Sequence, residues 1–111
     1  MHEMRLHNGP FEKIKSGTKT IEMRLNDEKR QLIKVGDLIK FVNRVTEEEL
    51  TTLVKGLYYY ESFDELYKHF DKVSIGYDLE DEADPNDMSQ YYSNEDIENY
   101  GVVGIEIEVT K

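Results

Sequence analysis

The chain has no cysteine and no tryptophan, and its 111 residues include only two prolines and three histidines. Without cysteine there can be no disulfide, thiolate metal ligand, cysteine nucleophile or thiol redox switch. The three histidines have no metal-ligand spacing, so we expect neither a metal nor another cofactor. Glycine-rich phosphate loops, dinucleotide fingerprints, serine-nucleophile elbows and zinc-protease motifs are missing as well.

Long apolar runs are also missing, and no segment resembles a transmembrane helix or the hydrophobic part of a signal peptide. We therefore expect a cytoplasmic protein with no membrane partner. The chain is long enough for one domain with its own core, because 38% of its residues are hydrophobic. We expect residues 1–111 to form that single domain.

Positive charge is scarce in the second half of a chain whose net charge is −10. Residues 1–44 contain ten Lys and Arg against six Asp and Glu, and the remainder contains four against eighteen. This balance disfavours tight binding to a phosphate backbone, so we expect no DNA partner and place any basic surface in the first half. Residues 78–98 hold nine acidic residues and no basic one. Such a run is typical of solvated surface, and it could also repel polymers and so favour small ligands.

Hydrophobic periodicity and capping residues predict the secondary structure. Strands are expected at 1–6, 18–25, 38–45, 50–60 and 102–109, and helical segments at 9–16, 63–70, 86–92 and 94–100. Asn8 is the expected N-cap of the first helix and Gly17 its stop, and Ser62 opens a capping box. The consecutive strands within 18–60 favour antiparallel pairing. The predicted fold is α+β and mainly β: a small mixed β-barrel with short helices over its ends.

The strongest candidate site lies in residues 17–24, where Lys19, Glu22 and Arg24 fall at the start of a strand. Glu22 and Arg24 share a strand face. The aliphatic part of the Lys19 side chain can pack on the core while its ammonium reaches the open end of the barrel. Lys19 and Glu22 are the catalytic candidates, as nucleophile or base and as proton relay. Arg24 has a planar guanidinium whose paired N–H donors can bind a carbonyl, carboxylate or phosphate. The alternative is a solvated strand face with an ion pair, which spacing alone favours.

A second candidate is the segment Tyr91, Tyr92 and Ser93. Adjacent aromatic residues before a helix cap can stack on a base or close a pocket, although tyrosines and caps are also ordinary structure. With Thr20 and Arg24, these three residues form the predicted substrate-binding set.

Five segments of the sequence resemble the ASCH (ASC-1 homology) family, which shares the PUA-like barrel and includes small bacterial proteins. They are residues 10–17, 18–25, 33–41, 62–66 and 100–107, and they include a Gly-x-Lys-x-x-Glu-x-Arg pattern followed by a Val-Gly-Asp turn. The resemblance implies a barrel with a cleft near the Lys-Glu-Arg strand and the last helices. It also implies that the cleft binds RNA or a nucleotide.

One small branch of that family hydrolyses N4-acetylcytidine with a Lys, a Thr and a Glu. Lys19 matches the lysine, Glu22 stands where that branch has threonine, and either Glu80 or Glu95 corresponds to the glutamate. Two functions follow from the resemblance. The first is an RNA- or nucleotide-binding domain with a cleft lined by Lys19, Glu22 and Arg24. The alternative is an amidohydrolase for a modified nucleoside such as N4-acetylcytidine. The partner is accordingly RNA or a nucleoside-like small molecule, and the sequence leaves open whether the protein is an enzyme.

Overall fold

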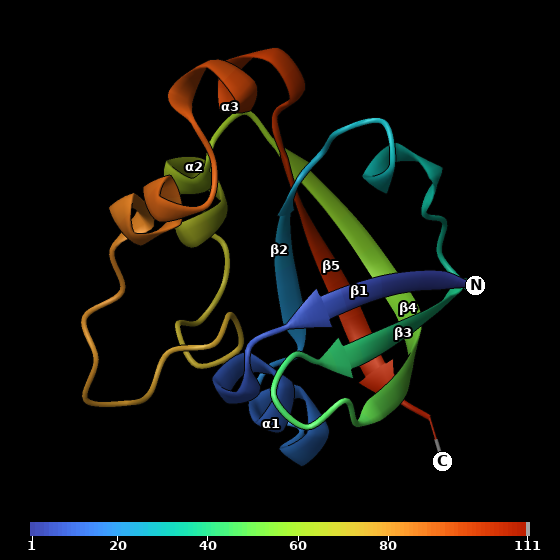
Figure 1. Ribbon diagram of the computed structural model, residues 1–111. Helices are drawn as coiled ribbons and strands as arrows, with labels where there is room; N and C mark the ends of the chain where they lie inside the picture. Colours follow the sequence, from blue (N-terminus) through green and yellow to red (C-terminus); the bar gives the residue numbers. More distant parts are fainter. Residues whose placement is uncertain (111) are drawn as a thin grey trace.

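A computed structural model describes residues 1–110 and shows one curled five-stranded sheet (Figure 1). The strands lie in the order β1 (His2–Leu6), β3 (Leu38–Asn43), β4 (Glu49–Tyr60), β5 (Val102–Val109) and β2 (Ile21–Leu25). β1 pairs with β3 in parallel, and the other three neighbouring pairs are antiparallel. The sheet forms a half-barrel whose open edges are β1 and β2. This architecture confirms the predicted mainly β, PUA-like fold class.

Short helices surround the sheet: α1 (Asn8–Ser16), the 3₁₀ helix η1 (Arg30–Leu32), α2 (Phe63–Tyr67), the 3₁₀ helix η2 (Pro85–Gln90) and α3 (Asn94–Tyr100). The predicted signals for several helix ends are present. Gly17 ends α1 in the left-handed conformation, with φ of 88°, and the Ser62 hydroxyl caps α2 by accepting a hydrogen bond from Glu65 N. The expected Asn8 cap is wrong. His7 occupies the N-cap, and Asn8 Oδ1 instead accepts a hydrogen bond from Asn43 Nδ2 at 3.0 Å.

The pairing predicted for the consecutive strands is correct for β3 with β4 but wrong for β2, which pairs with β5. A hairpin needs a short turn, whereas residues 26–37 between β2 and β3 include a helical turn and carry the chain away from β2. The free edge of β3 is then taken by β1. β2 is consequently an edge strand, and its start is held by hydrogen bonds from Thr20 N and Ile21 N to Ser74 O.

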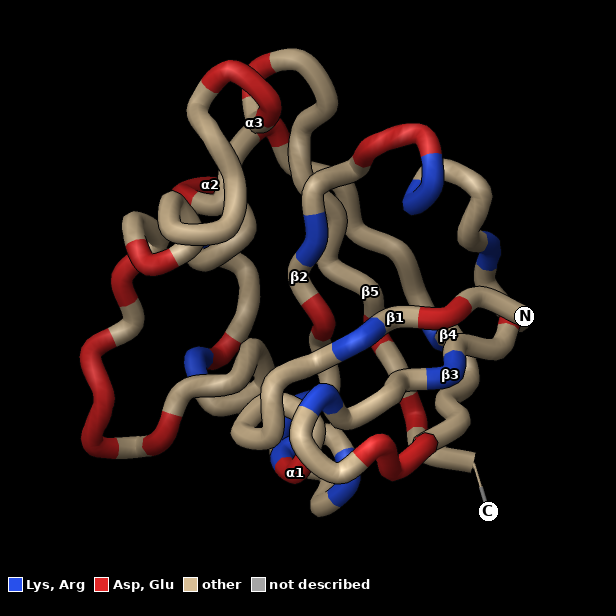
Figure 2. Tube along the Cα trace, viewed as in Figure 1, with Lys and Arg blue, Asp and Glu red and all other residues tan. Residues whose placement is uncertain are grey.

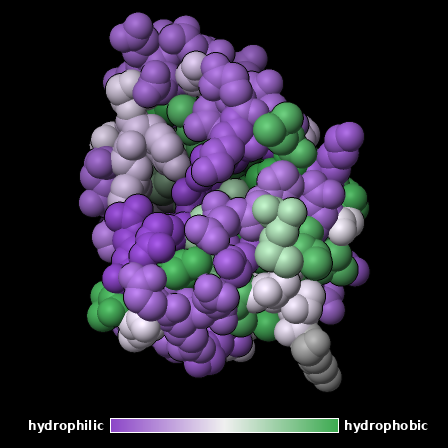
Figure 3. Space-filling view, turned by 45° about the vertical axis from the view of Figure 1, so that its right-hand side comes forward, coloured by the Kyte–Doolittle hydropathy of each residue, from purple (hydrophilic) through white to green (hydrophobic). Residues whose placement is uncertain are grey.

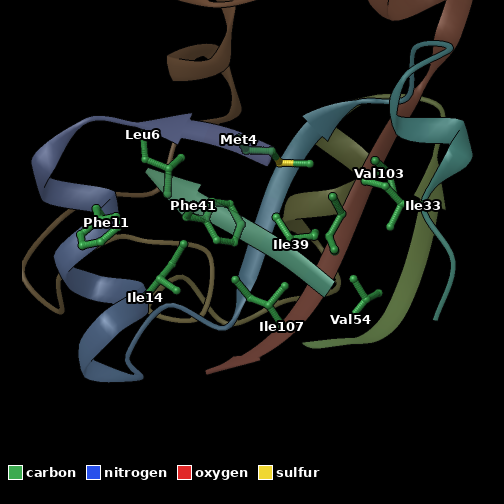
Figure 4. Packing of buried hydrophobic residues seen from close by; sticks show 11 residues of the cluster. Met4, Leu6, Phe11, Ile14, Ile33, Ile39, Phe41, Val54, Val103 and Ile107 are labelled. Atoms are coloured by element: carbon green, nitrogen blue, oxygen red, sulfur yellow. The ribbon is translucent and has the colours of Figure 1, made fainter. Parts of the chain in front are cut away.

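Two apolar clusters stabilise the molecule on opposite sides of the sheet. The inner cluster fills the half-barrel and is closed at one end by α1 through Phe11 and Ile14 (Figure 4). The outer cluster packs Ile21 and Met23 of β2 against α2, residue Ile75 and η2. β2 is therefore covered on its apolar face by helices and on its other face by the interior of the half-barrel. Across residues 1–110 the structure contains no helix both long enough and apolar enough to span a bilayer.

Candidate functional site

The register of β2 against β5 turns two polar side chains towards the inside of the half-barrel. Glu22 lies opposite Ile105 and Arg24 opposite Val103, and both partners belong to the inner core. Residues paired across antiparallel strands project to the same face of the sheet. Glu22 and Arg24 thus occupy the inner face at the open edge of the half-barrel, where no further strand covers them.

Lys19, Glu22 and Arg24 form one connected ionic cluster. Lys19 Nζ donates to Glu22 Oε1 at 2.7 Å, and Arg24 Nε donates to Glu22 Oε2 at 2.9 Å. Arg24 Nη2 lies 2.8 Å from the same Oε2, so the guanidinium meets the carboxylate with two nitrogens. Arg24 Nη2 also makes a long contact of 3.5 Å to the backbone carbonyl of Arg5 on β1. The cluster therefore links the two open edges of the sheet.

The cluster is buried, which distinguishes it from a surface ion pair. The side chains of Lys19, Glu22 and Arg24 are 8%, 4% and 15% exposed. Burial alone would raise the pKa of Glu22, but the charges of Lys19 and Arg24 outweigh it and lower that pKa. Burial also acts to lower the pKa of Arg24. The charge of Glu22, and to a smaller extent Tyr92, outweighs the effect of burial, so the pKa of Arg24 is raised. The ion pair of the predicted alternative is present, but its solvated strand face is wrong, because the three side chains are buried.

A glycine turn covers the stem of Lys19. Gly76 has φ of 113°, a conformation that side chains rarely adopt, and a Cβ at that position would lie 3.3 Å from Lys19 Cδ. The turn is tied to α1, because Lys13 Nζ donates to Gly76 O at 2.8 Å. The tight approach of this turn keeps water away from the lysine stem while its ammonium reaches Glu22.

The ionic cluster forms part of the wall of a cleft of about 450 Å³. The cleft lies between β2, the end of β1, the start of α1, the turn at Gly76, and η2 with the tyrosines after it. Its charged lining residues are Arg5, Lys13, Lys19, Arg24, Arg44, Glu22 and Asp87. Five cations and two carboxylates line the cleft, and Glu47 and Asp78 pair with Arg5 and Lys13 from outside the lining. The cleft thus keeps a small positive excess in a protein whose net charge is −10. Figure 2 shows basic positions along β1, β2 and α1, and a separate loop with mainly acidic positions that stands apart from the sheet.

Tyrosines form the opposite wall of the cleft. Tyr67 and Tyr77 share a hydrogen bond of 2.9 Å between their hydroxyls, and Tyr77 OH donates to Asp87 Oδ2 at 2.7 Å. Burial and these two hydrogen bonds raise the pKa of Tyr77, which therefore stays neutral. Tyr92 stacks on Phe63 with ring centroids 5.8 Å apart, whereas Tyr91 is 57% exposed. Tyr92 is fixed by packing, and Tyr91 offers a free ring face at the cleft.

The structure brings most, but not all, of the predicted site residues together. Lys19, Glu22, Arg24, Tyr91 and Tyr92 all line the cleft. Two predicted substrate-binding residues lie elsewhere. The side chain of Thr20 is exposed and does not line the cleft, and the Ser93 hydroxyl caps α3 by accepting from Asp96 N at 3.1 Å.

Neither glutamate proposed as the acidic partner of Lys19 occupies that position. Glu80 and Glu95 are both exposed and do not line the cleft. The carboxylate in contact with Lys19 is Glu22, three residues along the chain. Its place on the inner face of an edge strand brings it within reach of the lysine.

Several lining residues have no local signal in the sequence. Tyr67 belongs to an apolar helix stripe, and Tyr77 and Asp87 lie in the acidic half of the chain. Arg5 and Arg44 were indicated only collectively, by the excess of basic residues in 1–44. Their convergence depends on contacts between distant segments. Among residues 1–110, no three His, Asp or Glu side chains group as ligands for a metal ion.

On the face drawn in Figure 3, hydrophilic residues predominate and hydrophobic residues show in separate groups. Large exposed apolar patches are a mark of protein or membrane contacts.

Comparisons with known proteins agree with this fold. The family model of the ASCH domain matches residues 4–111. The hypothetical protein PH0355 is 38% identical, with a TM-score of 0.82 and 97% of each chain covered. The solution structure of PF0455 from Pyrococcus furiosus is 35% identical, with a TM-score of 0.71 over 99% of this chain and 97% of that one.

A more distant likeness concerns fold alone. A serine-to-alanine variant of ZmASCH from Zymomonas mobilis has a TM-score of 0.68 at 13% identity, covering 96% of this chain and 66% of that one. The search of curated proteins found no match.

Proposed function

Because this chain belongs to the ASCH domain family, we propose that its cleft binds one nucleotide unit, either free or within RNA. The observation that carries the proposal is the buried Lys19–Glu22–Arg24 cluster in the wall of a positive cleft. Buried charges are costly unless paired, and a protein without use for them is more easily stabilised by apolar side chains. A cleft of about 450 Å³ also falls within the range of small-molecule sites.

Two groups in the cleft suit an anion or carbonyl on the ligand. Arg24 donates to Glu22 through Nε and Nη2, and no hydrogen bond from its Nη1 occurs within residues 1–110, although Tyr92 also stabilises its charge. Arg44 is exposed at the rim and forms no ion pair with any part of the chain that the structure describes. Guanidinium groups bind phosphate and carbonyl oxygens through paired N–H donors.

The tyrosine wall suits the base. Aromatic rings stack on nucleobases, and each such contact is worth about 1–3 kcal/mol. Tyr91 is the ring better placed to do so: it contacts Tyr92 at a centroid distance of 6.5 Å but is 57% exposed, whereas Tyr92 already packs on Phe63.

A matched pair of tyrosine variants tests the proposal. Tyr91 and Tyr59 are 57% and 55% exposed, but only Tyr91 lines the cleft. Nucleoside 5′-monophosphates are titrated into the protein by calorimetry or by NMR. Y91A should weaken binding about tenfold, and Y59A should leave it unchanged. R44A and K34A form a second pair for the phosphate: both residues are exposed, but only Arg44 lines the cleft, so R44A should weaken binding and K34A should not. Equal effects of Y91A and Y59A, or no binding by the unaltered protein, would overturn the proposal.

A second candidate, amide hydrolysis on a modified nucleoside, rests on the 2.7 Å contact between Lys19 Nζ and Glu22 Oε1. Water would add to the amide carbonyl carbon and pass a proton to Glu22, while Lys19 and Arg24 stabilise the oxyanion. Glu22 would then return that proton to the leaving amine as the C–N bond breaks, giving acid and amine. In the variant mechanism, Lys19 gives a proton to Glu22 and its neutral Nζ adds to the carbonyl carbon. Glu22 returns that proton to the leaving amine as its C–N bond breaks, and water then hydrolyses the acyl-lysine to release the acid and restore Lys19.

Release of acetate from N4-acetylcytidine tests this candidate. K19R keeps a cation beside Glu22, so activity should persist if Lys19 only stabilises charge and vanish if Lys19 attacks the carbonyl. Loss of one oxyanion donor costs about 3 kcal/mol, so R24K should slow turnover about 100-fold. No acetate release by the folded, unaltered protein would exclude the reaction on this substrate.

A further inference from the structure

We infer that the cleft selects a single nucleotide-sized ligand and rejects a continuous RNA strand, because its two sides carry opposite charge. This inference rests on the proposed function and names the ligand class within it. It uses a feature that nucleotide binding alone does not require, the acidic segment 78–87.

The basic side comes from the N-terminal part of the chain. Arg5 lies on β1, Lys13 on α1 and Arg44 just after β3, and all three line the cleft. Arg5 is paired with Glu47 and Lys13 with Asp78, so Arg44, which forms no ion pair within residues 1–110, is the cation on this side that is most open to a ligand phosphate.

The acidic side is the segment 78–87, which contains six acidic residues and no basic one. Both ends of this segment reach the site. Asp87 lines the cleft, and Asp78 Oδ1 lies 3.1 Å from Nζ of the lining residue Lys13. The acidic loop stands away from the sheet, and β2 and α1 lie between it and β3 in the view of Figure 2.

The acidic segment is held in place rather than left as a free tail. Lys72 Nζ donates to the carbonyls of Leu79 and Asp81, each at 2.7 Å. Tyr77 OH donates to Asp87 at its far end. A segment fixed in this way keeps its charge at a defined place beside the cleft.

Two carboxylates of this segment remain free to act at a distance. Glu80 and Glu82 are exposed, and neither takes part in an ion pair within residues 1–110. Charges interact over a Debye length of about 10 Å at 0.1 M salt. A mononucleotide can aim its one phosphate at the basic side. A strand that enters the cleft must carry its next phosphates past the acidic segment, where like charges repel.

The experiment compares a 5′-mononucleotide with an oligoribonucleotide of about ten residues, at about 20 mM and about 0.3 M salt. E80Q/E82Q neutralises the acidic segment, and E95Q/E98Q removes the same two charges from exposed positions on α3. At low salt, E80Q/E82Q should strengthen oligonucleotide binding about fivefold and change mononucleotide binding less than about twofold. The gain should disappear at high salt, and E95Q/E98Q should show at most a small part of it.

The outcomes separate this inference from the proposed function. If the unaltered protein binds the mononucleotide and binds the oligonucleotide as tightly or more tightly at low salt, selection by charge is wrong and nucleotide binding stands. Equal gains in E80Q/E82Q and E95Q/E98Q would also overturn it, because net charge rather than the placed segment would then set the affinity. Failure of the unaltered protein to bind any mononucleotide would overturn the proposed function itself.

Discussion

Glu22 is the residue on which the candidate site depends. Its carboxylate holds Lys19 and Arg24 at 2.7–2.9 Å, and each of the three side chains is at least four-fifths buried. Removing one partner from a buried ionic cluster leaves uncompensated charge, and that is more destabilising than losing a surface pair.

Glu22→Gln should therefore lower the free energy of unfolding by about 3–5 kcal/mol, because it leaves two buried cations without a counter-charge. Urea denaturation measures the loss. Glu108→Gln is the control. Glu108 is exposed and its contact with Lys55 is 3.7 Å, so the change should stay within about 0.5 kcal/mol. Equal stabilities of the two variants would show that the cluster contributes no more than a surface pair.

The pH dependence of stability follows from the same residue. Burial acts to raise the pKa of Glu22, but Lys19 and Arg24 outweigh it, so the folded-state pKa lies below the unfolded one. As the pH falls, the unfolded chain takes up the proton first. The contribution of the charged carboxylate is thus complete above the unfolded pKa of about 4.3 and is lost as the pH falls through the folded pKa.

The stability difference between the unaltered protein and E22Q should accordingly be constant from about pH 6 to 8 and shrink below about pH 4.3. Denaturant titrations at a series of pH values measure this difference. A difference that grows on acidification would contradict the lowered pKa. Glu108→Gln again serves as the reference for general acid effects.

At the scale of elements, the site is made by an edge strand and the turn that covers it. β2 has its apolar residues against α2 and η2, and its polar residues on the inner face beside β5. The turn at Gly76 lies against the stem of Lys19 and receives a hydrogen bond from Lys13 on α1. Strand, turn and helix therefore position the lysine together.

Gly76→Ala should lower stability by about 1–3 kcal/mol, because φ of 113° strains any residue with a side chain and the new Cβ would press on Lys19. Ligand affinity should fall with it, since Lys19 would be displaced. Gly9→Ala is the control: Gly9 also lines the cleft, lies in α1 and has no atom within 4 Å of an added Cβ. That change should be neutral or stabilise by up to about 1 kcal/mol. Thermal unfolding of the two variants provides the comparison, and a Gly76→Ala protein of full stability would exclude the strain.

At the scale of the whole molecule, an excess of negative charge coexists with a positive cleft. The net charge is −10, while five cations and two carboxylates line the cleft. Repulsion among exposed carboxylates weakens with salt, whereas buried pairs such as Lys19–Glu22 are screened much less.

The melting temperature at pH 7 should consequently rise when salt is raised from about 10 mM to about 0.3 M. Scanning calorimetry or thermal unfolding followed by circular dichroism measures the shift. The E80Q/E82Q variant should show a smaller rise, because it starts with less repulsion. A melting temperature that falls with salt would mean that surface ion pairs such as Arg5–Glu47 outweigh the repulsion.

Local features of the fold could be predicted from the chain because their causes are local. Alternation marks the strands, Gly17 ends α1, and Ser62 caps α2, since each depends on neighbours within a few positions. The pairing of Glu22 with Arg24 is local as well, because residues two apart in a strand share a face, whereas the position of Lys19 beside them also depends on the turn at Gly76.

What covers the faces of β2 was decided by contacts between distant parts of the chain. Periodicity states which residues share a face, but it does not state which face turns inwards. Pairing with β5 turned Glu22 towards the interior, and the packing of residues 67–92 brought Tyr77 and Asp87 to it. The same packing left Thr20 at the surface and used Ser93 as a helix cap. The burial that separates an enclosed ionic cluster from an ordinary surface pair is therefore a property of the tertiary structure.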